Sequence, residues 1–131
     1  MTQLNGTDIP AVFTDAVRVN LSDCSLLYIG GKLGTLPDGK LAGRTMKEQA
    51  QRCLERIKSV VEHEGGTMDD IVRVRVFVAY HDVQSIRDIH EVRSTFWTDP
   101  SKYPASTLVI APLVIDGALI EIEADAAIPR K

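Results

Sequence analysis

The feature that most constrains the fold is a long apolar run from Pro104 to Ala127. In its second half, Leu119 to Ala126, carboxylates alternate with apolar residues, and a period of two predicts a strand with one acidic and one apolar face. Its first half, Ala105 to Ala111, is apolar enough on both sides that neither face is suited to water. The sequence therefore predicts a sheet in which one strand must be covered on both faces. The three acids of the alternating strand are Glu121, Glu123 and Asp125.

The length of 131 residues predicts a single domain, residues 1–131, large enough to bury a core. Hydrophobic residues make up 44% of the chain and charged residues 25%, which is usual for a globular protein and argues against disorder. No apolar run reaches the roughly 20 residues of a spanning helix, and the polar start, residues 1–8, is not typical of a signal peptide. We therefore expect a cytoplasmic protein with no membrane partner.

The net charge argues against a nucleic-acid-binding protein, and the cysteines and histidines argue against a metalloprotein. The formal net charge is −3 and the sequence has no block of lysines and arginines, which argues against a nucleic-acid partner. Cys24 and Cys53 are too few and too far apart for a metal knuckle, and Cys53 is expected to be a small buried hydrophobe in a helix. His63, His81 and His90 lack the spacing of a metal site. We expect neither a metal nor any other cofactor.

The rest of the chain predicts two helices and three further strands. A helix is expected from Thr45 to Gly65, because Thr45 and Glu48 form a capping box and apolar residues follow at helical spacing. A second helix is expected from Asp82, a favourable cap, to the residues before Pro100. Its expected core stripe is Ile86, Ile89, Val92 and Phe96. The expected strands of the whole chain are residues 11–19, 25–29, 71–79, 105–111 and 119–126.

The glycine-rich segment Gly30 to Gly34 follows the second expected strand. A phosphate-binding loop would need the spacing GxxxxGK[ST] before a helix, but Leu33 follows Lys32 here. We expect instead a bulge and a close backbone approach where the strand leaves the sheet.

The order strand, strand, helix, strand, helix, strand, strand predicts an α+β fold, with one mixed sheet and both helices on a single face. In the expected strand 71–79 the valines share the face that a helix covers, and Arg73, Arg75 and Phe77 share the other. That open face is too apolar to remain in water, so we expect copies of the chain to cover it. The valines are Val72, Val74, Val76 and Val78.

Several motifs together resemble the RidA/YjgF family of reactive intermediate deaminases over nearly the whole chain. They are LLYIGG, the block EQAQRCLERIKSVVEHEGGTMDDIVRVRVFV, a helix containing HEV and FW, the segment YPAST, and the terminal LIEIEADA. The resemblance implies a chorismate-mutase-like fold, a homotrimer, and clefts between subunits that bind a small-molecule metabolite.

The resemblance also implies a chemistry, the hydrolysis of enamines and imines to a keto acid and ammonia. Glu121 matches the glutamate that orients water or moves protons, and Thr107 keeps a hydroxyl at the family's position. Four positions depart from the family pattern. Ser106 stands where the family has the arginine that grips the substrate carboxylate, Phe13 replaces an aromatic hydroxyl, His90 matches an asparagine, and Leu108 stands where some members have a cysteine.

Loss of that arginine matters because a charge-assisted hydrogen bond contributes about 1.5–3 kcal/mol, or roughly ten- to a hundredfold in affinity. Two cations are candidates to replace it in substrate binding. Arg75 is expected on the same sheet face as Glu121, and Lys32 lies beside Gly31 in the glycine-rich segment. The alternative is that both cations are structural, and Glu121 itself can be a solvated acid.

Two functions of different classes therefore remain open. The first is an enzyme that deaminates a small enamine or imine with altered specificity, using Glu121 for proton transfer. The second is a non-catalytic trimer that binds a small ligand or a protein. A serine hydrolase is not expected, because Ser106 is not in a GxSxG turn.

Overall fold

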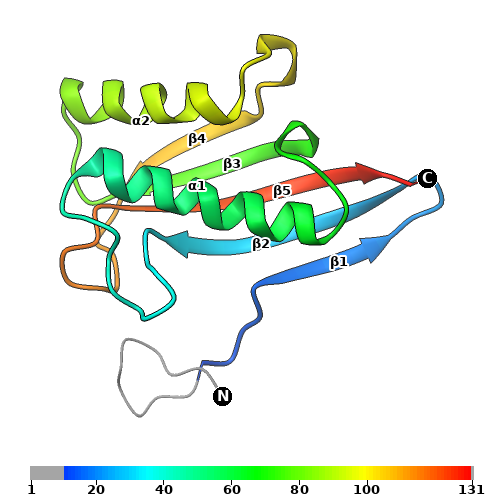
Figure 1. The fold of residues 1–131 in the computed structure, drawn as a ribbon, viewed down its shortest axis with the longest axis horizontal. Helices are drawn as coiled ribbons and strands as arrows, with labels where there is room; N and C mark the ends of the chain where they lie inside the picture. Colours follow the sequence, from blue (N-terminus) through cyan, green and yellow to red (C-terminus); the bar gives the residue numbers. More distant parts are fainter. Residues whose placement is uncertain (1–10, 131) are drawn as a thin grey trace.

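The computed structural model describes residues 11–130, so the polar start at residues 1–8 lies outside the described part. Within that part, the strands and helices follow one another in the expected order (Figure 1). Their bounds are β1 Ala16–Asn20, β2 Cys24–Leu33, α1 Met46–His63, β3 Ile71–Val78, α2 Val83–Phe96, β4 Ala105–Ile110 and β5 Ile120–Pro129. Short 3₁₀ turns at Met68–Asp70 and Pro100–Lys102 precede β3 and β4.

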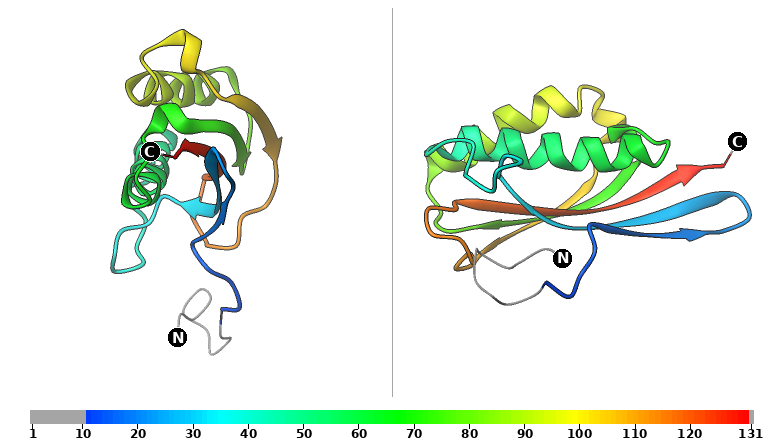
Figure 2. Two further views of the ribbon diagram at one scale, coloured as in Figure 1. Left: turned by 90° about the vertical axis from the view of Figure 1, so that its right-hand side faces the viewer. Right: turned by 60° about the horizontal axis from the view of Figure 1, so that its bottom comes forward.

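The five strands form one sheet in the order β1-β2-β5-β3-β4. The sheet is mixed, because β3 and β4 run parallel while the other neighbours are antiparallel. Both helices lie on the same side of the curved sheet (Figure 2). The predicted α+β fold with two helices on one face is confirmed.

Local signals place both helix starts. Glu48 N donates to Thr45 Oγ1 at 3.1 Å, and Thr45 N donates back to Glu48 Oε1 at 3.3 Å, which is the predicted capping box. Asp82 Oδ1 accepts from Ser85 N at 2.7 Å at the start of α2. After α1, Gly65 adopts a φ of +88°, the left-handed conformation that glycine takes readily.

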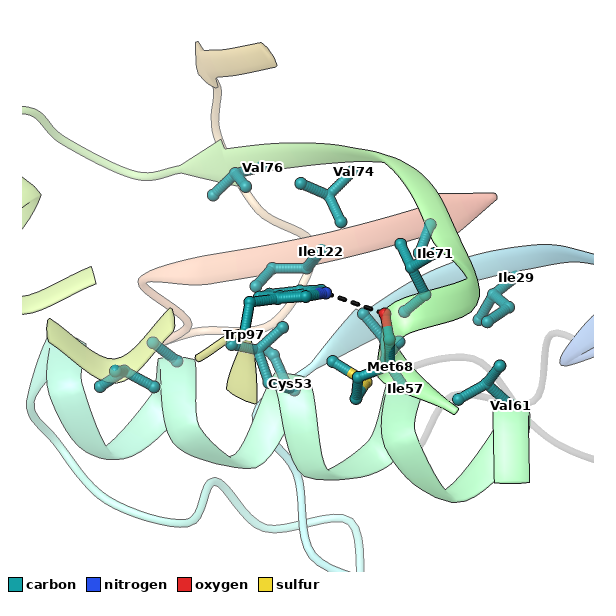
Figure 3. Close-up of a cluster of buried hydrophobic side chains, with 14 of the residues drawn as sticks. Ile29, Cys53, Ile57, Val61, Met68, Ile71, Val74, Val76, Trp97 and Ile122 are labelled. Carbon is teal, nitrogen blue, oxygen red and sulfur yellow. Dashed lines mark hydrogen bonds between the residues drawn. The ribbon is translucent and has the colours of Figure 1, made fainter. Parts of the chain in front are cut away.

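The core lies between the helices and the sheet and includes Cys53, as predicted (Figure 3). Trp97, which follows α2, is 2% exposed and lies inside this core. Its indole Nε1 donates to the backbone oxygen of Met68 at 2.9 Å, so the one polar atom of the ring is satisfied. This bond fixes the ring between the two helices and the sheet.

Several predicted strand bounds are wrong. β1 begins at Ala16 rather than at residue 11, and β5 continues to Pro129. β2 continues through the glycines to Leu33, with a register shift between Ile29 and Lys32 against β5. The expected bulge is therefore present, but the strand does not leave the sheet there. β2 begins at Cys24 rather than at residue 25.

A second register shift, between Ile71 and Arg73, overturns the predicted face of Val72. Val72 is 53% exposed, and Ile71 takes the buried place, while the remaining valines of β3 are buried as expected. The core stripe of α2 is also narrower than predicted. Ile86 and Phe96 are half-buried, and the small Ser85 is buried.

The sheet face away from the helices is open. On β5 the acids are half-buried and the residues between them are fully buried, so the alternating pattern is confirmed. Every residue of β4 is exposed, although the strand is largely apolar. Neither helix in residues 11–130 has the length and apolar composition that crossing a bilayer requires.

Candidate functional site

Glu121 lies on the open face of β5, opposite Phe77 of β3 and Leu33 of β2. Its carboxyl pKa is raised above the ordinary value of 4.5, first because the group is partly removed from water and second because Glu123 is close. A carboxyl group whose proton is held more tightly than usual suits general acid and base work near neutral pH.

Gly31 is the neighbour that gives Glu121 its position. A β-carbon placed on Gly31 would overlap the Glu121 carboxylate, so only glycine allows this carboxylate to lie against β2. The register shift of β2 occurs at this residue. The structure therefore brings Gly31 and Glu121 together, as the site prediction requires.

Lys32 is buried and lies on the other side of β2 from Gly31. It is opposite Ile122, whose side chain faces the helices. Its Nζ donates to the backbone oxygen of Asp15 at 3.0 Å and approaches Asp15 Oδ1 at 3.3 Å. Burial lowers the pKa of this lysine, and Asp15 partly offsets the effect. Lys32 thus holds the segment before β1 against the sheet, and its role in substrate binding stays a prediction.

Arg75 shares the open face with Glu121 but bonds to other acids. Its Nη1 lies 3.3 Å from Glu123 Oε1 and 3.7 Å from Asp125 Oδ2. These are ion pairs between neighbouring strands, β3 and β5. Arg75 is already balanced by two carboxylates, and its binding role also stays a prediction.

The two hydroxyl residues of β4 point to opposite faces. Ser106 is in register with the buried Val74 and faces the helix side, whereas Thr107 is in register with Arg75 on the open side. Ser106 Oγ accepts a hydrogen bond of 2.9 Å from Arg93 Nη1 of α2. A guanidinium therefore lies at the position where the family arginine is absent.

The remaining predicted residues lie at the periphery. His90 is exposed on α2 and lines a hollow of about 330 Å³ together with Arg93. Phe13 precedes β1 and is 71% exposed.

The predicted residues fall into two groups that one protomer does not join. Gly31 and Glu121 lie on β2 and β5, whereas Ser106 and His90 lie on β4 and α2. In the sheet order, β3 separates β5 from β4. Glu121 pairs with Phe77 of β3, and Ser106 pairs with Val74, which is three residues earlier on the same strand. Two strand spacings and three residues along a strand place the Cα atoms of Glu121 and Ser106 roughly 14 Å apart, on opposite faces. If both groups serve one ligand, they come from different protomers.

Sequence reasoning missed Arg93 and Asp15. The helical spacing of Arg93 and Trp97 indicates that both point to one side of α2. Nothing in the sequence shows that this side meets β4 at Ser106. The ion pair of Asp15 with Lys32 likewise depends on how the segment before β1 crosses the end of β2.

No group of three or more histidine, cysteine, aspartate or glutamate side chains in residues 11–130 is close enough to hold a metal ion. The site is therefore described by its protein groups alone: a half-buried carboxylate against a glycine on the open face, and a guanidinium with a hydroxyl beside a hollow.

Comparison with known proteins gives a consistent result. The family model described as endoribonuclease L-PSP matches residues 9–128. A RutC family protein of Saccharolobus solfataricus is 32% identical over 98 residues, covering 74% of this chain and 75% of the relative. A protein of Dermatophagoides farinae named 2-iminobutanoate/2-iminopropanoate deaminase is 27% identical, covering 85% of this chain and 81% of the relative.

A solved structure agrees with the sequence matches. The crystal structure of RidA from an Antarctic Psychrobacter species superposes with a TM-score of 0.77 at 28% identity. The superposition covers 95% of this chain and 94% of that one.

Proposed function

The chain belongs to the family described as endoribonuclease L-PSP, which is the RidA/YjgF family, and we propose that it hydrolyses small enamines or imines to a carbonyl compound and ammonia. The single observation that carries this proposal is the half-buried Glu121 carboxyl, with its raised pKa, lying against the side-chain-free Gly31. The name of the Dermatophagoides relative states the same class of reaction for that protein.

The reaction balances with water as the only co-reactant. The imine reacts in its N-protonated form: water adds its oxygen to the imine carbon and loses a proton to the Glu121 carboxylate, giving a neutral carbinolamine. Glu121 then returns this proton to the nitrogen, the carbon–nitrogen bond breaks, and the hydroxyl proton passes to the Glu121 carboxylate as the carbonyl forms, so that the carbonyl and ammonia leave and ammonia or water takes up the last proton. An enamine first takes a proton on carbon to become the imine. A carboxyl with a raised pKa can act in both directions near neutral pH.

We also propose that the protein is a homotrimer with the ligand cleft between subunits. Three observations support this assembly: β4 is exposed on both faces, the sheet is open opposite the helices, and the two groups of site residues lie too far apart in one protomer. A cytoplasmic location remains an expectation from the sequence.

One observation favours a second candidate, a trimer that binds a small metabolite without turning it over. β4 has the sequence ASTLVI and supplies no arginine at the family's carboxylate-binding position. In that case, replacing Ser106 by arginine creates ammonia release that the natural sequence lacks. The acidic net charge gives no support to the RNA cleavage that the family's description suggests.

The test is ammonia release from 2-iminopropanoate generated in the assay. Glu121→Gln keeps the shape of the side chain but cannot accept a proton, so the rate should fall by about a hundredfold or more. Glu62→Gln is the matched control, because Glu62 is an exposed carboxylate on α1. Full activity in Glu121→Gln would remove the catalytic role. A wild type that binds the 2-oxo acid product but releases no ammonia would favour the second candidate.

A further inference from the structure

A hollow between α2 and the segment leading to β4 contains a cation that the proposed chemistry leaves unused. Its volume of about 330 Å³ lies in the range of small-ligand pockets. Figure 1 shows the end of α2 near the start of β4, and the residues that line the hollow come from α2 and from the segment that joins these two elements. The lining residues are His90, Arg93, Ser94, Trp97, Tyr103 and Pro104.

The charge of Arg93 is poorly compensated. Its guanidinium has five N–H donors, and within residues 11–130 its one bonded acceptor is the neutral Ser106 Oγ, at 2.9 Å. In the same part of the chain, no carboxylate oxygen lies within 4.0 Å of it. Partial burial lowers the pKa of Arg93, in agreement with a cation that has lost water without gaining an acid.

The walls of the hollow are apolar and one of them is fixed. The guanidinium carbon of Arg93 lies 5.8 Å from the centre of the Trp97 ring, a cation–π distance. Trp97 is buried and is held by its bond to Met68, so this wall does not need to rearrange around a ligand. Tyr103 and Pro104 also line the hollow and are more exposed than Trp97.

We propose that Arg93 is the carboxylate-binding residue of this protein, and that the hollow beside it takes small monocarboxylates with an apolar or planar body. The guanidinium presents two parallel donors to the carboxylate, Ser106 holds the guanidinium in place, and the apolar body lies against Tyr103 and Pro104. This inference rests on the proposed function and names its substrate class: 2-imino or enamino acids with a small apolar side chain.

The other two cations considered fit this role less well. Arg75 is balanced by Glu123 and Asp125, and Lys32 is committed to Asp15. Arg93 alone of the three lies at Ser106, the β4 position where the resemblance leads one to expect an arginine. The cation near Ser106 at this end of β4 is thus supplied by α2 and not by the strand itself.

The test measures binding separately from turnover. Benzoate is a stable carboxylate with a planar apolar body, and its dissociation constant is measured by calorimetry for the wild type and variants. Arg93→Gln should weaken binding by about ten- to a hundredfold, because the charge-assisted fork is lost. Arg93→Lys keeps the charge without the fork and should fall between the two. Arg87→Gln, which removes an exposed arginine of the same helix, should bind as the wild type does.

Thermal unfolding of each variant shows whether the fold is intact. Benzamide is the ligand control: it lacks the charge of benzoate, so it should bind weakly, and with equal affinity, to the wild type and to Arg93→Gln. Benzoate binding that is unchanged in a folded Arg93→Gln would overturn the inference, as would a wild type that does not bind benzoate. If benzoate binding depends on Arg93 but the wild type releases no ammonia, the proposed deaminase activity fails and the carboxylate site stands.

Discussion

β4 and β5 are strands of the same sheet with similarly apolar sequences, yet they have opposite surroundings. β5 lies between β2 and β3, and its apolar residues are buried under the helices while its acids are half-buried on the open face. β4 is at the edge, pairs with β3 alone, and is exposed along its whole length. Its apolar side chains in water are Leu108, Val109 and Ile110.

The protomer buries the apolar face of β5 under its own helices and leaves β4 exposed to another surface. An alternating strand needs a cover on one face, which the two helices supply. A strand that is apolar on both faces and stands at an edge invites pairing or packing with a second molecule. This difference between β5 and β4 predicts that substitutions under β5 destabilise the protomer and that substitutions on β4 weaken the assembly.

Removing core volume under β5 should cost much more than the same change on β4. Ile122→Ala leaves a cavity beneath the helices and should lower the free energy of unfolding by about 2–5 kcal/mol. Ile110 is 58% exposed, and Ile110→Ala should cost less than about 0.5 kcal/mol in dilute protein. Urea unfolding at low protein concentration measures both, and equal losses would show that β4 is covered within the protomer.

Introducing charge on β4 should break the assembly and leave the protomer folded. Val109→Asp places a carboxylate in the surface that we propose to be buried between copies, and should weaken association by about tenfold or more. Sedimentation velocity reads the assembly and circular dichroism reads the fold. Val83→Asp, at an exposed valine of α2, is the control. A wild type that sediments as a folded monomer would remove the proposed cover of β4.

The ionised Glu121 carboxylate should slightly lower the free energy of unfolding at neutral pH. Its pKa is raised in the folded chain, so the folded state holds the proton more tightly than the unfolded state does. Stability then falls as pH rises from the ordinary value of 4.5 through the raised value. Glu121→Gln should therefore be more stable than the wild type at pH 7, by less than about 1 kcal/mol because the group is partly solvated.

This gain should vanish in acid. Below about pH 4 both states carry a protonated carboxyl, and the two proteins should unfold at nearly the same denaturant concentration. Urea unfolding of both proteins from pH 3 to pH 8 measures the difference. A difference that does not change with pH would mean that the effect of the substitution is not electrostatic.

The smallest effect is expected for Arg75 on the same face. Its contacts with Glu123 and Asp125 are about one third exposed, so Arg75→Gln should cost only about 0–1 kcal/mol. Salt should reduce that cost, because the pairs are accessible to ions. Unfolding in low salt and in 1 M sodium chloride, an ionic strength at which the screening length is about 3 Å, checks this. A large cost that salt does not change would show that the pair is buried by another subunit.

Features encoded in short stretches could be predicted from the sequence. The capping box at Thr45, the cap at Asp82 and the alternation of β5 each depend on residues a few positions apart, and each is confirmed. The side of the sheet that the helices cover followed from the same patterns, since the apolar faces of both helices and of β3 and β5 have to meet.

Features that depend on one extra residue or on a distant contact could not be predicted. The register shift after Ile71 moves Val72 out of the core, and a shift of one residue leaves no mark in an apolar strand. The contact of Arg93 with Ser106 joins a helix to an edge strand and depends on the path of residues 97–104. The register of the strands and the contacts of the predicted site residues therefore required the three-dimensional structure.

Trp97 has a consequence for how binding preference can change in this protein. Trp97 is buried in the core and is also one of the residues that line the hollow, so a substitution that reshapes this wall of the proposed ligand site also opens a void beneath α2. Tyr103 and His90 line the hollow but are exposed, so substitutions there leave the core intact. Changes in ligand specificity should therefore arise at these two positions, while Trp97 is retained.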